Sequence, residues 1–310
     1  MFCLLGHNGA GKTTTINMLT GLFPPSEGHI TVFGKDIVDN LEDVRAMIGI
    51  CPQHDILWNE MSPCEHLRLF SRLKDLDESV VEETVESTLK HVNLYLVRDH
   101  PVSSFSGGMK RRLSVAISSI GDPSVIFMDE PTTGMDPKSR RQVWGMIEDL
   151  KKDRVIIMTT HSMDEAEMLS DRVGIMARGA LKCIGTSLYL KNTYGKGYRL
   201  SLLTAMDAKT VHEVKVLVAH CLPEVILQTE SGGSLMYSLQ NCEKEAILRF
   251  ISLLERNGES SGNPQMDQVL STIMDWGISQ AGLEEVFLSV TGHGTANESN
   301  VIRYVPDRQV

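Results

Sequence analysis

The sequence predicts an α/β domain in which helices cover a parallel sheet, followed by a smaller α+β module with a ferredoxin-like order of elements. Three observations support this fold class. Short, β-rich apolar runs alternate with helical patterns in the first half, which is typical of parallel sheets. Residues 52–124 lack any strand pattern, which indicates a helical insertion. From about Gly197 the order becomes strand, helix, strand, strand, helix, strand.

The strands expected in the first domain are short runs of β-branched and other apolar residues, bounded by turn or helix signals. They are Phe2–Leu5, Ile30–Phe33, Ile48–Cys51, Val125–Asp129, Val155–Thr159 and Val173–Met176.

The sequence predicts several helix N-termini within the insertion and after it. Ser62 and Glu65 have capping-box spacing, with Pro63 at the first helical position, so a helix should begin there. Apolar residues at helical spacing over 80–92 predict a second, amphipathic helix. Asp136-Pro137, and Ser162 with Glu165, mark two later helix starts. The insertion is therefore expected to be a helical subdomain.

The domain boundaries follow from the change of pattern. We expect the first domain to cover residues 1–195 and the ferredoxin-like module to cover 196–290, with a loop at 257–265 and a polar, flexible tail at 291–310. The module's expected strands and helices are Tyr198–Leu203, Ala208–His220, Glu224–Gln228, Leu235–Leu239, Glu243–Glu255 and Leu270–Asp275.

Composition limits the function classes. Lys plus Arg is 30 and Asp plus Glu is 40, giving a net charge of −10, which disfavours a nucleic-acid partner. The six cysteines are dispersed and are expected to be reduced thiols. No apolar run approaches the ~20 residues needed to cross a bilayer.

The segment from Gly6 to Thr13 fits the pattern GxxxxGK[ST] between a strand and a helical run, which is the context that a P-loop requires. Glycines let backbone N–H groups surround phosphates at a helix start. Lys12 is expected to reach the β and γ phosphates, and Thr13 to offer its hydroxyl to Mg²⁺. The alternative is a plain glycine turn before a helix.

The run Val125–Glu130 is an apolar strand that ends in two carboxylates. Asp129 would lie at the carboxyl end of the strand, beside the P-loop, where it suits Mg²⁺. Glu130, one residue further, could orient the attacking water or accept its proton. Only the P-loop upstream makes this otherwise common pattern informative.

Residues Phe105 to Arg112 (FSGGMKRR) resemble the signature motif of ATP-binding cassette proteins. The order of the other motifs agrees with this resemblance. Gln53 resembles the family's Q-loop residue, His161 its switch histidine, and Thr133 to Asp136 its D-loop. A lone glutamine or histidine at a strand end is more often structural, so their order and spacing carry the argument.

Within that family the sequence is most similar to the A subfamily, whose members are mostly associated with lipid movement. The segments that carry this resemblance are GHNGAGKTTT from Gly6, SGGMKRRLSVA from Ser106, MDEPTTGMDP from Met128, TTHSMDEAEMLSDR from Thr159, YGKGYRLSL from Tyr194 and LEEVFLSV from Leu283. The resemblance implies that the second module is a regulatory domain.

The resemblance also implies the site residues, with ATP and Mg²⁺ as cofactors. The catalytic residues would be Glu130, His161 and Gln53, and the metal ligands Thr13, Gln53 and Asp129. The nucleotide-binding residues would be Gly6, His7, Asn8, Gly9, Ala10, Gly11, Lys12, Thr13, Thr14, Ser106, Gly107, Gly108 and Asp136.

Two cassettes of this family face head to tail, so that the Ser106 helix of one completes the ATP site of the other. The implied partners are a second cassette and membrane-spanning segments in a longer polypeptide or a partner chain. The implied location is the cytoplasmic face of a membrane.

The sequence departs from the family pattern at two places. The signature has Phe105 and Met109 where Leu and Gln are common, which the A subfamily tolerates. Only five residues precede Gly6, so we expect the domain to lack the family's N-terminal β segment and its adenine-stacking aromatic residue. Two alternatives stay open, namely a catalytically weak cassette that acts as an interaction module and a non-transport cassette ATPase.

Overall fold

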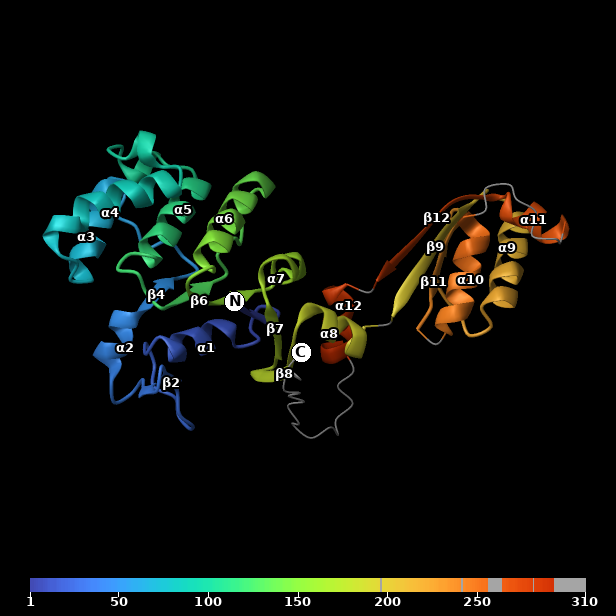
Figure 1. The fold of residues 1–310 in the computed structure, drawn as a ribbon, viewed down its shortest axis with the longest axis horizontal. Coiled ribbons are helices and arrows are strands. Elements are labelled where there is room, and N and C mark those ends of the chain that lie inside the picture. Colours follow the sequence, from blue (N-terminus) through green and yellow to red (C-terminus); the bar gives the residue numbers. More distant parts are fainter. Residues whose placement is uncertain (196, 241, 256–263, 281, 293–310) are drawn as a thin grey trace. The chain divides into compact units, whose positions relative to one another are not determined.

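The computed structural model describes residues 1–195, 197–240, 242–255, 264–280 and 282–292 (Figure 1). Within these ranges the chain forms two compact units, one containing Met1–Ser187 and one that begins at Leu188. The boundary predicted from the sequence lies between residues 195 and 196. The difference arises because helix α8 (Ser187–Tyr194) groups with the second unit.

The first unit is built on a six-stranded sheet in the order β4-β5-β6-β1-β7-β8. All neighbouring pairs are parallel except β7 with β8, which are antiparallel. The strands are β1 (Phe2–Leu5), β4 (Ile48–Cys51), β5 (Val125–Asp129), β6 (Val155–Thr160), β7 (Arg172–Ala177) and β8 (Ala180–Gly185). The carboxyl ends of β4, β5, β6 and β1 therefore share one edge of the sheet.

Helices cover both faces of this sheet (Figure 1). Helices α1 (Lys12–Leu19) and α2 (Leu41–Met47) bury Ile16 and Val44 against Val125 and Phe127. The opposite face carries α5 (Gly107–Ser118), α6 (Pro137–Leu150) and α7 (Met163–Leu169). Burial on both faces explains why β5 is apolar from Val125 to Met128 rather than alternating.

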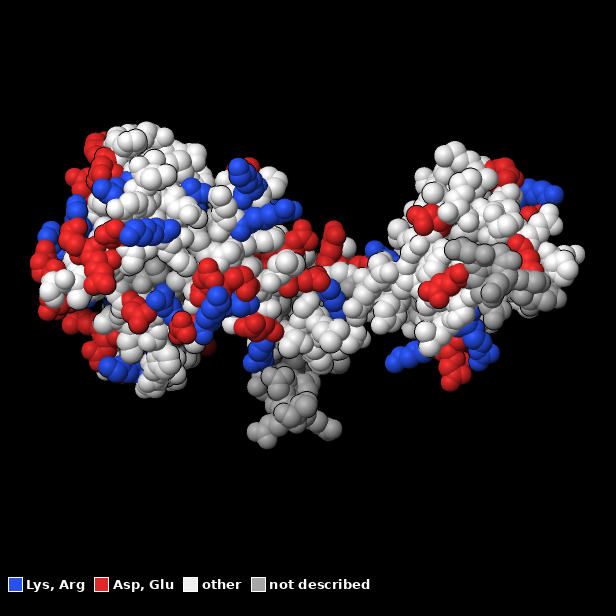
Figure 2. Space-filling model, turned by 45° about the horizontal axis from the view of Figure 1, so that its top comes forward, with Lys and Arg blue, Asp and Glu red and all other residues white. Residues whose placement is uncertain are grey.

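The insertion folds as the predicted helical subdomain, with α3 (Pro63–Leu73), α4 (Glu78–His91) and the short 3₁₀ turns η1 (Tyr95–Val97) and η2 (Val102–Ser104). The capping box is present, since the Ser62 hydroxyl accepts from the Glu65 N–H at 3.3 Å and the Glu65 carboxylate from the Ser62 N–H at 2.7 Å. Acidic side chains gather over the α3 and α4 end of the face in Figure 2. Arg68 pairs there with Glu82, joining the two helices.

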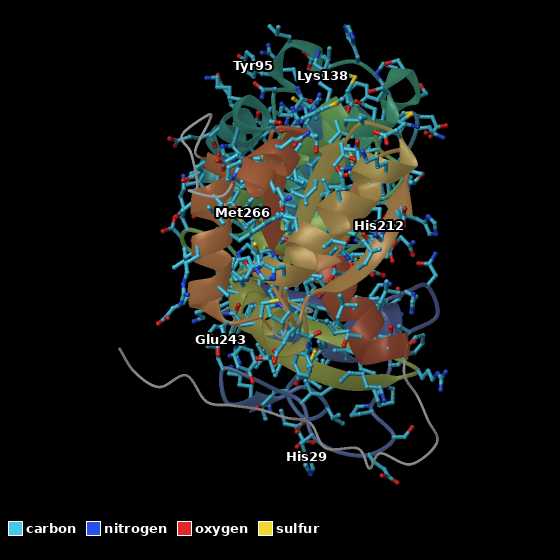
Figure 3. All side chains as sticks on the ribbon, turned by 90° about the vertical axis from the view of Figure 1, so that its right-hand side faces the viewer. His29, Tyr95, Lys138, His212, Glu243 and Met266 are labelled. Carbon is cyan, nitrogen blue, oxygen red and sulfur yellow. The ribbon has the colours of Figure 1, made fainter. Side chains whose placement is uncertain are left out.

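The second unit contains a four-stranded antiparallel sheet in the order β10-β11-β9-β12, which is the ferredoxin-like arrangement. Its elements are β9 (Tyr198–Thr204), α9 (Ala208–Cys221), β10 (Ile226–Ser231), β11 (Ser234–Ser238), α10 (Lys244–Glu255), α11 (Pro264–Leu270), β12 (Ile273–Gln280) and α12 (Leu283–Gly292). Buried Leu200, Val214 and Phe250 belong to a common core. Figure 3 labels His212 on α9 and Met266 on α11, two helices that contact each other.

Three sequence expectations are corrected by the structure. The run Ile30–Phe33 does not join the main sheet; β2 (Thr31–Val32) pairs only with β3 (Lys35–Asp36), because Phe33 and Gly34 both have positive φ and turn the chain tightly back. Strand β8 was missed. The last module strand begins at Ile273 rather than Leu270, because Pro264–Leu270 forms α11.

Most of the expected 257–265 loop and 291–310 tail lie outside the described residues, although α11 begins at Pro264 and α12 continues to Gly292. Among the described residues, no helix has the combined length and apolar composition of a membrane span.

All six cysteines carry free thiols, as expected. Cys3 and Cys51 lie in the interior of the sheet, and burial raises the pKa of the Cys51 thiol to about 11. A thiol in such a site stays protonated at neutral pH and is therefore a poor nucleophile.

We predict that Gly49→Ala destabilises the first unit. A Cβ at Gly49 would lie 1.9 Å from the Ser118 carbonyl oxygen at the end of α5, so β4 and α5 must move apart. Overpacking of this kind costs about 1–3 kcal/mol. Urea unfolding followed by circular dichroism measures the loss.

The matched control is Gly145→Ala, in the exposed middle of α6, where an added Cβ meets nothing within 4 Å. This change should raise the free energy of unfolding by about 0.5–1 kcal/mol, because alanine loses less backbone entropy in a helix. Equal stability of the two variants would contradict the close contact between β4 and α5.

Candidate nucleotide-binding site

The turn between β1 and α1 has the geometry of a phosphate-binding loop. Gly9 and Gly11 have φ of 78° and 102°, which glycine adopts without steric cost. A Cβ at Gly11 would also lie 2.9 Å from Cε of Met176, so the Met176 side chain would have to shift to admit it. Helix α1 begins directly afterwards at Lys12, which places a helix N-terminus at the loop.

The Lys12 side chain folds back over this loop. Its ammonium donates to the carbonyl oxygens of Gly6 at 2.8 Å and His7 at 3.1 Å, and it lies 3.1 Å from Oε1 of Glu130. Lys12 is only 4% exposed, so this positive charge is held in a confined polar setting. A buried ammonium above a glycine turn at a helix start fits the phosphates of a nucleotide.

The Glu130 carboxylate is the centre of the site. Besides Lys12, it contacts Thr133 Oγ1 at 2.9 Å, His161 Nδ1 at 3.1 Å and Gln53 Nε2 at 3.4 Å. The structure thus brings together the predicted residues Lys12, Gln53, Glu130 and His161, which come from the ends of different strands.

Burial acts to raise the pKa of the Glu130 carboxyl, but hydrogen bonds from Lys12 and Thr133 and the charge of Lys12 outweigh it, so the pKa lies below its ordinary value. Glu130 is therefore ionised at neutral pH. Its favourable contacts stabilise the fold above the ordinary carboxyl pKa and are lost as pH falls through the lowered value.

Thr159, on β6, holds the two acidic residues of the β5 end and was not predicted as a site residue. Its buried hydroxyl donates to the carboxylate of Asp129 and accepts from the Glu130 N–H at 3.1 Å. The Thr159 carbonyl oxygen accepts from the same N–H. These bonds hold Glu130 at φ of 45°, a left-handed conformation that is uncommon for any residue except glycine.

Glu165 links the segments on either side of the site. It is 1% exposed, and its carboxylate accepts from the hydroxyls of Thr132 at 2.7 Å and Thr160 at 2.5 Å and from the Trp144 indole N–H at 3.2 Å. Thr132 lies two residues after Glu130, and Thr160 lies directly before His161. The Glu165 carboxylate therefore fixes the segment that follows Glu130 and the segment that carries His161. The sequence analysis recognised Glu165 only through its capping position.

Four further predicted residues, Ser106, Gly107, Gly108 and Asp136, lie at the starts of α5 and α6. Ser106 caps α5, where its hydroxyl accepts from the Met109 N–H at 3.3 Å, and Ser106 and Gly107 are exposed. Asp136 caps α6 and accepts from the N–H groups of Lys138 and Ser139, each at 3.0 Å. Figure 3 labels Lys138 in this first turn.

Comparisons with known proteins agree with this geometry. The family model described as "ABC transporter" matches residues 1–133. "ABC transporter A family member 9" from Arabidopsis thaliana is 42% identical over 97% of this chain and 31% of its own length. "Phospholipid-transporting ATPase ABCA3" from Rattus norvegicus is 41% identical over 93% of this chain and 16% of its own. The chain thus spans less than a third of these relatives.

A solved structure, "Structure of ATP binding subunit of ABC transporter", superposes with a TM-score of 0.57 at 30% identity, over 63% of this chain and 82% of the other. The chain belongs to the ATP-binding cassette family, whose members bind and hydrolyse ATP. Its sequence relatives place it in the A subfamily, as a nucleotide-binding domain.

We predict that Lys12→Ala weakens ATP and ADP binding alike, because the ammonium is expected to serve the β as well as the γ phosphate. Loss of a charged hydrogen bond of about 1.5–3 kcal/mol corresponds to roughly 10- to 150-fold in affinity. Titration calorimetry with each nucleotide measures the change.

The control is Lys152→Ala, which removes an exposed lysine paired with Asp149 and should leave both affinities unchanged. Equal nucleotide affinity in the wild type and Lys12→Ala would overturn the assignment of the loop.

Proposed function

We propose that this cassette hydrolyses ATP in a head-to-tail pair and that the hydrolysis powers transport of a lipid across a membrane. The observation that carries the proposal is the convergence of Lys12, Gln53 and His161 on the Glu130 carboxylate. Such a cluster suits a reaction in which phosphate charge must be neutralised and one water molecule oriented.

The residues for the nucleotide and its metal are those of the P-loop and the end of β5. Backbone N–H groups from Gly6 to Thr14 and the Lys12 ammonium would hold the phosphates. The Thr13 hydroxyl and the Asp129 carboxylate, with Gln53, would hold Mg²⁺, a cation that is usually bound by one or two carboxylates together with phosphate oxygens. When bound, Mg²⁺ neutralises charge that develops on the phosphate oxygens.

Glu130 would orient the attacking water. The carboxylate is ionised because its pKa is lowered, so it accepts a hydrogen bond from water at neutral pH. The side chain of His161 is 45% exposed and contacts Glu130, so it could reach both this carboxylate and a γ phosphate. Gln53 would sense the same water through its amide.

The second half of each site would come from another cassette. Ser106 and Gly107 are exposed at the start of α5, where N–H groups and the helix dipole suit an anion. The Ser106 hydroxyl accepts from the Met109 N–H and the Ser106 carbonyl oxygen from the Lys110 N–H, so these bonds lie within α5 and do not join Ser106 to the Glu130 cluster. A head-to-tail pair would bring this helix start onto the partner's nucleotide.

Transport and its substrate are inferred from the subfamily. One relative is named as a phospholipid-transporting ATPase, which supports a lipid as the substrate. Membrane-spanning segments of the full-length protein or of a partner would carry the lipid, with the cassette at the cytoplasmic face. The ferredoxin-like module is proposed to regulate the cassette pair.

We predict that Glu130→Gln keeps ATP affinity but slows turnover by about 10²- to 10⁴-fold, because phosphate contacts survive while the water loses its charged acceptor. Phosphate release and nucleotide titration on the same protein separate the two effects. Glu86→Gln, which alters an exposed carboxylate on α4, serves as the control and should leave turnover intact. Undiminished hydrolysis by Glu130→Gln would exclude Glu130.

We predict that two inactive variants restore activity to each other. Lys12→Ala lacks a phosphate contact and Ser106→Arg blocks the start of α5, so each should be inactive alone. In a mixed pair, Lys12 of the Ser106→Arg chain faces the intact Ser106 of the other chain, which rebuilds one site. Phosphate release from the mixture should exceed the sum of the separate proteins, and no excess would count against the head-to-tail pair.

A further inference from the structure

Arg111, in the second turn of α5, has a buried guanidinium whose side chain is 6% exposed. On one side it binds the loop that follows β4. Nη1 donates to the carbonyl oxygens of Pro52 at 2.6 Å and Gln53 at 3.2 Å, and lies 3.2 Å from the Asp55 carboxylate. The same carboxylate oxygen accepts from the Ser114 hydroxyl at 2.7 Å, so the loop is tied to α5 at two successive turns.

On its other side the same guanidinium binds the end of β5. Nη2 donates to the carbonyl oxygens of Asp129 at 3.1 Å and Glu130 at 3.3 Å, and Nε donates to that of Pro131 at 2.6 Å. All three nitrogens of a five-donor group are thus used. Five of the six acceptors are backbone carbonyls, so Arg111 fixes main-chain positions rather than individual side chains.

The two anchored segments are those that carry Gln53 and Glu130, whose side chains contact each other at 3.4 Å. Arg111 is also close to Ser106, which caps the same helix, and an α-helix rises only ~1.5 Å per residue. A displacement of the start of α5 is therefore carried to Arg111, and from it to the backbone on both sides of the catalytic carboxylate.

We propose that Arg111 is a positioning residue that links the signature helix to the Gln53 loop and to Glu130 of the same chain. The inference rests on the proposed function, in which the start of α5 contacts the partner's nucleotide. Contact of Ser106 with the nucleotide bound to the partner would then govern how well Gln53 and Glu130 are placed on the nucleotide bound to their own chain. The first turn of α5 connects Ser106 to Arg111, and the Arg111 guanidinium connects the helix to the two segments.

The geometry requires arginine rather than a positive charge alone. The six acceptors are divided among Nη1, Nη2 and Nε, three nitrogens that a guanidinium holds in a fixed, planar arrangement. A lysine ammonium has three donors on one atom and could serve only some of the acceptors. Arg111→Lys should therefore keep the buried charge yet lose the link between the two segments.

The test compares Arg111→Lys and Arg111→Met with the wild type. Both variants should lower kcat roughly 10- to 100-fold, as expected for misplaced catalytic groups, while the Kd for ATP changes less than about threefold because the P-loop is untouched. Amide hydrogen exchange in residues 52–58 should become faster in both variants, because their anchor is lost.

The control is Arg68→Met. Arg68 also makes a two-point contact with a carboxylate, at 2.6 and 2.8 Å to Glu82, but it lies exposed between α3 and α4. This variant should keep the wild-type kcat and the wild-type exchange of residues 52–58. A purely structural arginine at 111 would lower thermal stability without separating kcat from Kd.

Asp55→Ala tests the same link without changing the buried group. The Asp55 side chain is 23% exposed, so this variant should fold, and it should show a smaller fall in kcat with faster exchange of the loop. Wild-type kcat in Arg111→Lys, or an equal loss of kcat and ATP affinity, would overturn the proposal.

Failure of ATP turnover and failure of the Arg111 link give different experimental results. Absence of turnover in the wild-type chain would count against the proposed function alone. The exchange measurement would still decide whether Arg111 anchors residues 52–58, and unchanged exchange in Arg111→Met would overturn the link.

Discussion

The first unit depends on the pairing of the buried Glu130 carboxylate with its neighbours. A charge at 6% exposure is costly unless it is paired, and here a lysine, a histidine, an amide and a hydroxyl supply the partners. The lysine, the histidine and the amide come from segments that are distant in sequence, so these three pairings require the segments that follow β1, β6 and β4 to lie beside the end of β5. The parallel arrangement meets this requirement because it places the carboxyl ends of β4, β5, β6 and β1 at one edge.

Buried polar groups around that carboxylate hold the segments that follow the strands in fixed positions and so define the site. Thr159 joins the two acidic residues of β5, and Glu165 joins the segments that follow β5 and β6. Arg111 adds the loop after β4 through main-chain carbonyls. Each polar group has its hydrogen bonds satisfied within the protein, which restricts the loops to one arrangement.

Much of this could be predicted from the sequence, because the relevant signals are local. Apolar runs between turns marked β1, β4 and β5 at their observed bounds, and capping residues marked the starts of α3 and α6. The P-loop residues were found through their spacing, and Gln53, Ser106, Asp136 and His161 through their resemblance to family motifs. The β2–β3 hairpin, β8 and the supporting residues were not, because they depend on pairings across the chain. Nothing in the run SGGMKRR indicates that Arg111 points inward while its neighbour Lys110 is half-exposed.

The left-handed backbone at Glu130 affects which residues evolution can accept at this position. A non-glycine residue at φ of 45° holds conformational strain, typically about 1–3 kcal/mol, that glycine would relieve. Glycine would also leave the buried Lys12 ammonium without its carboxylate, however, and the loss of a buried ion-pair partner costs more than this strain. A copy of this domain freed from the need to hydrolyse ATP should therefore keep a carboxylate at this position for as long as Lys12 stays buried beside it.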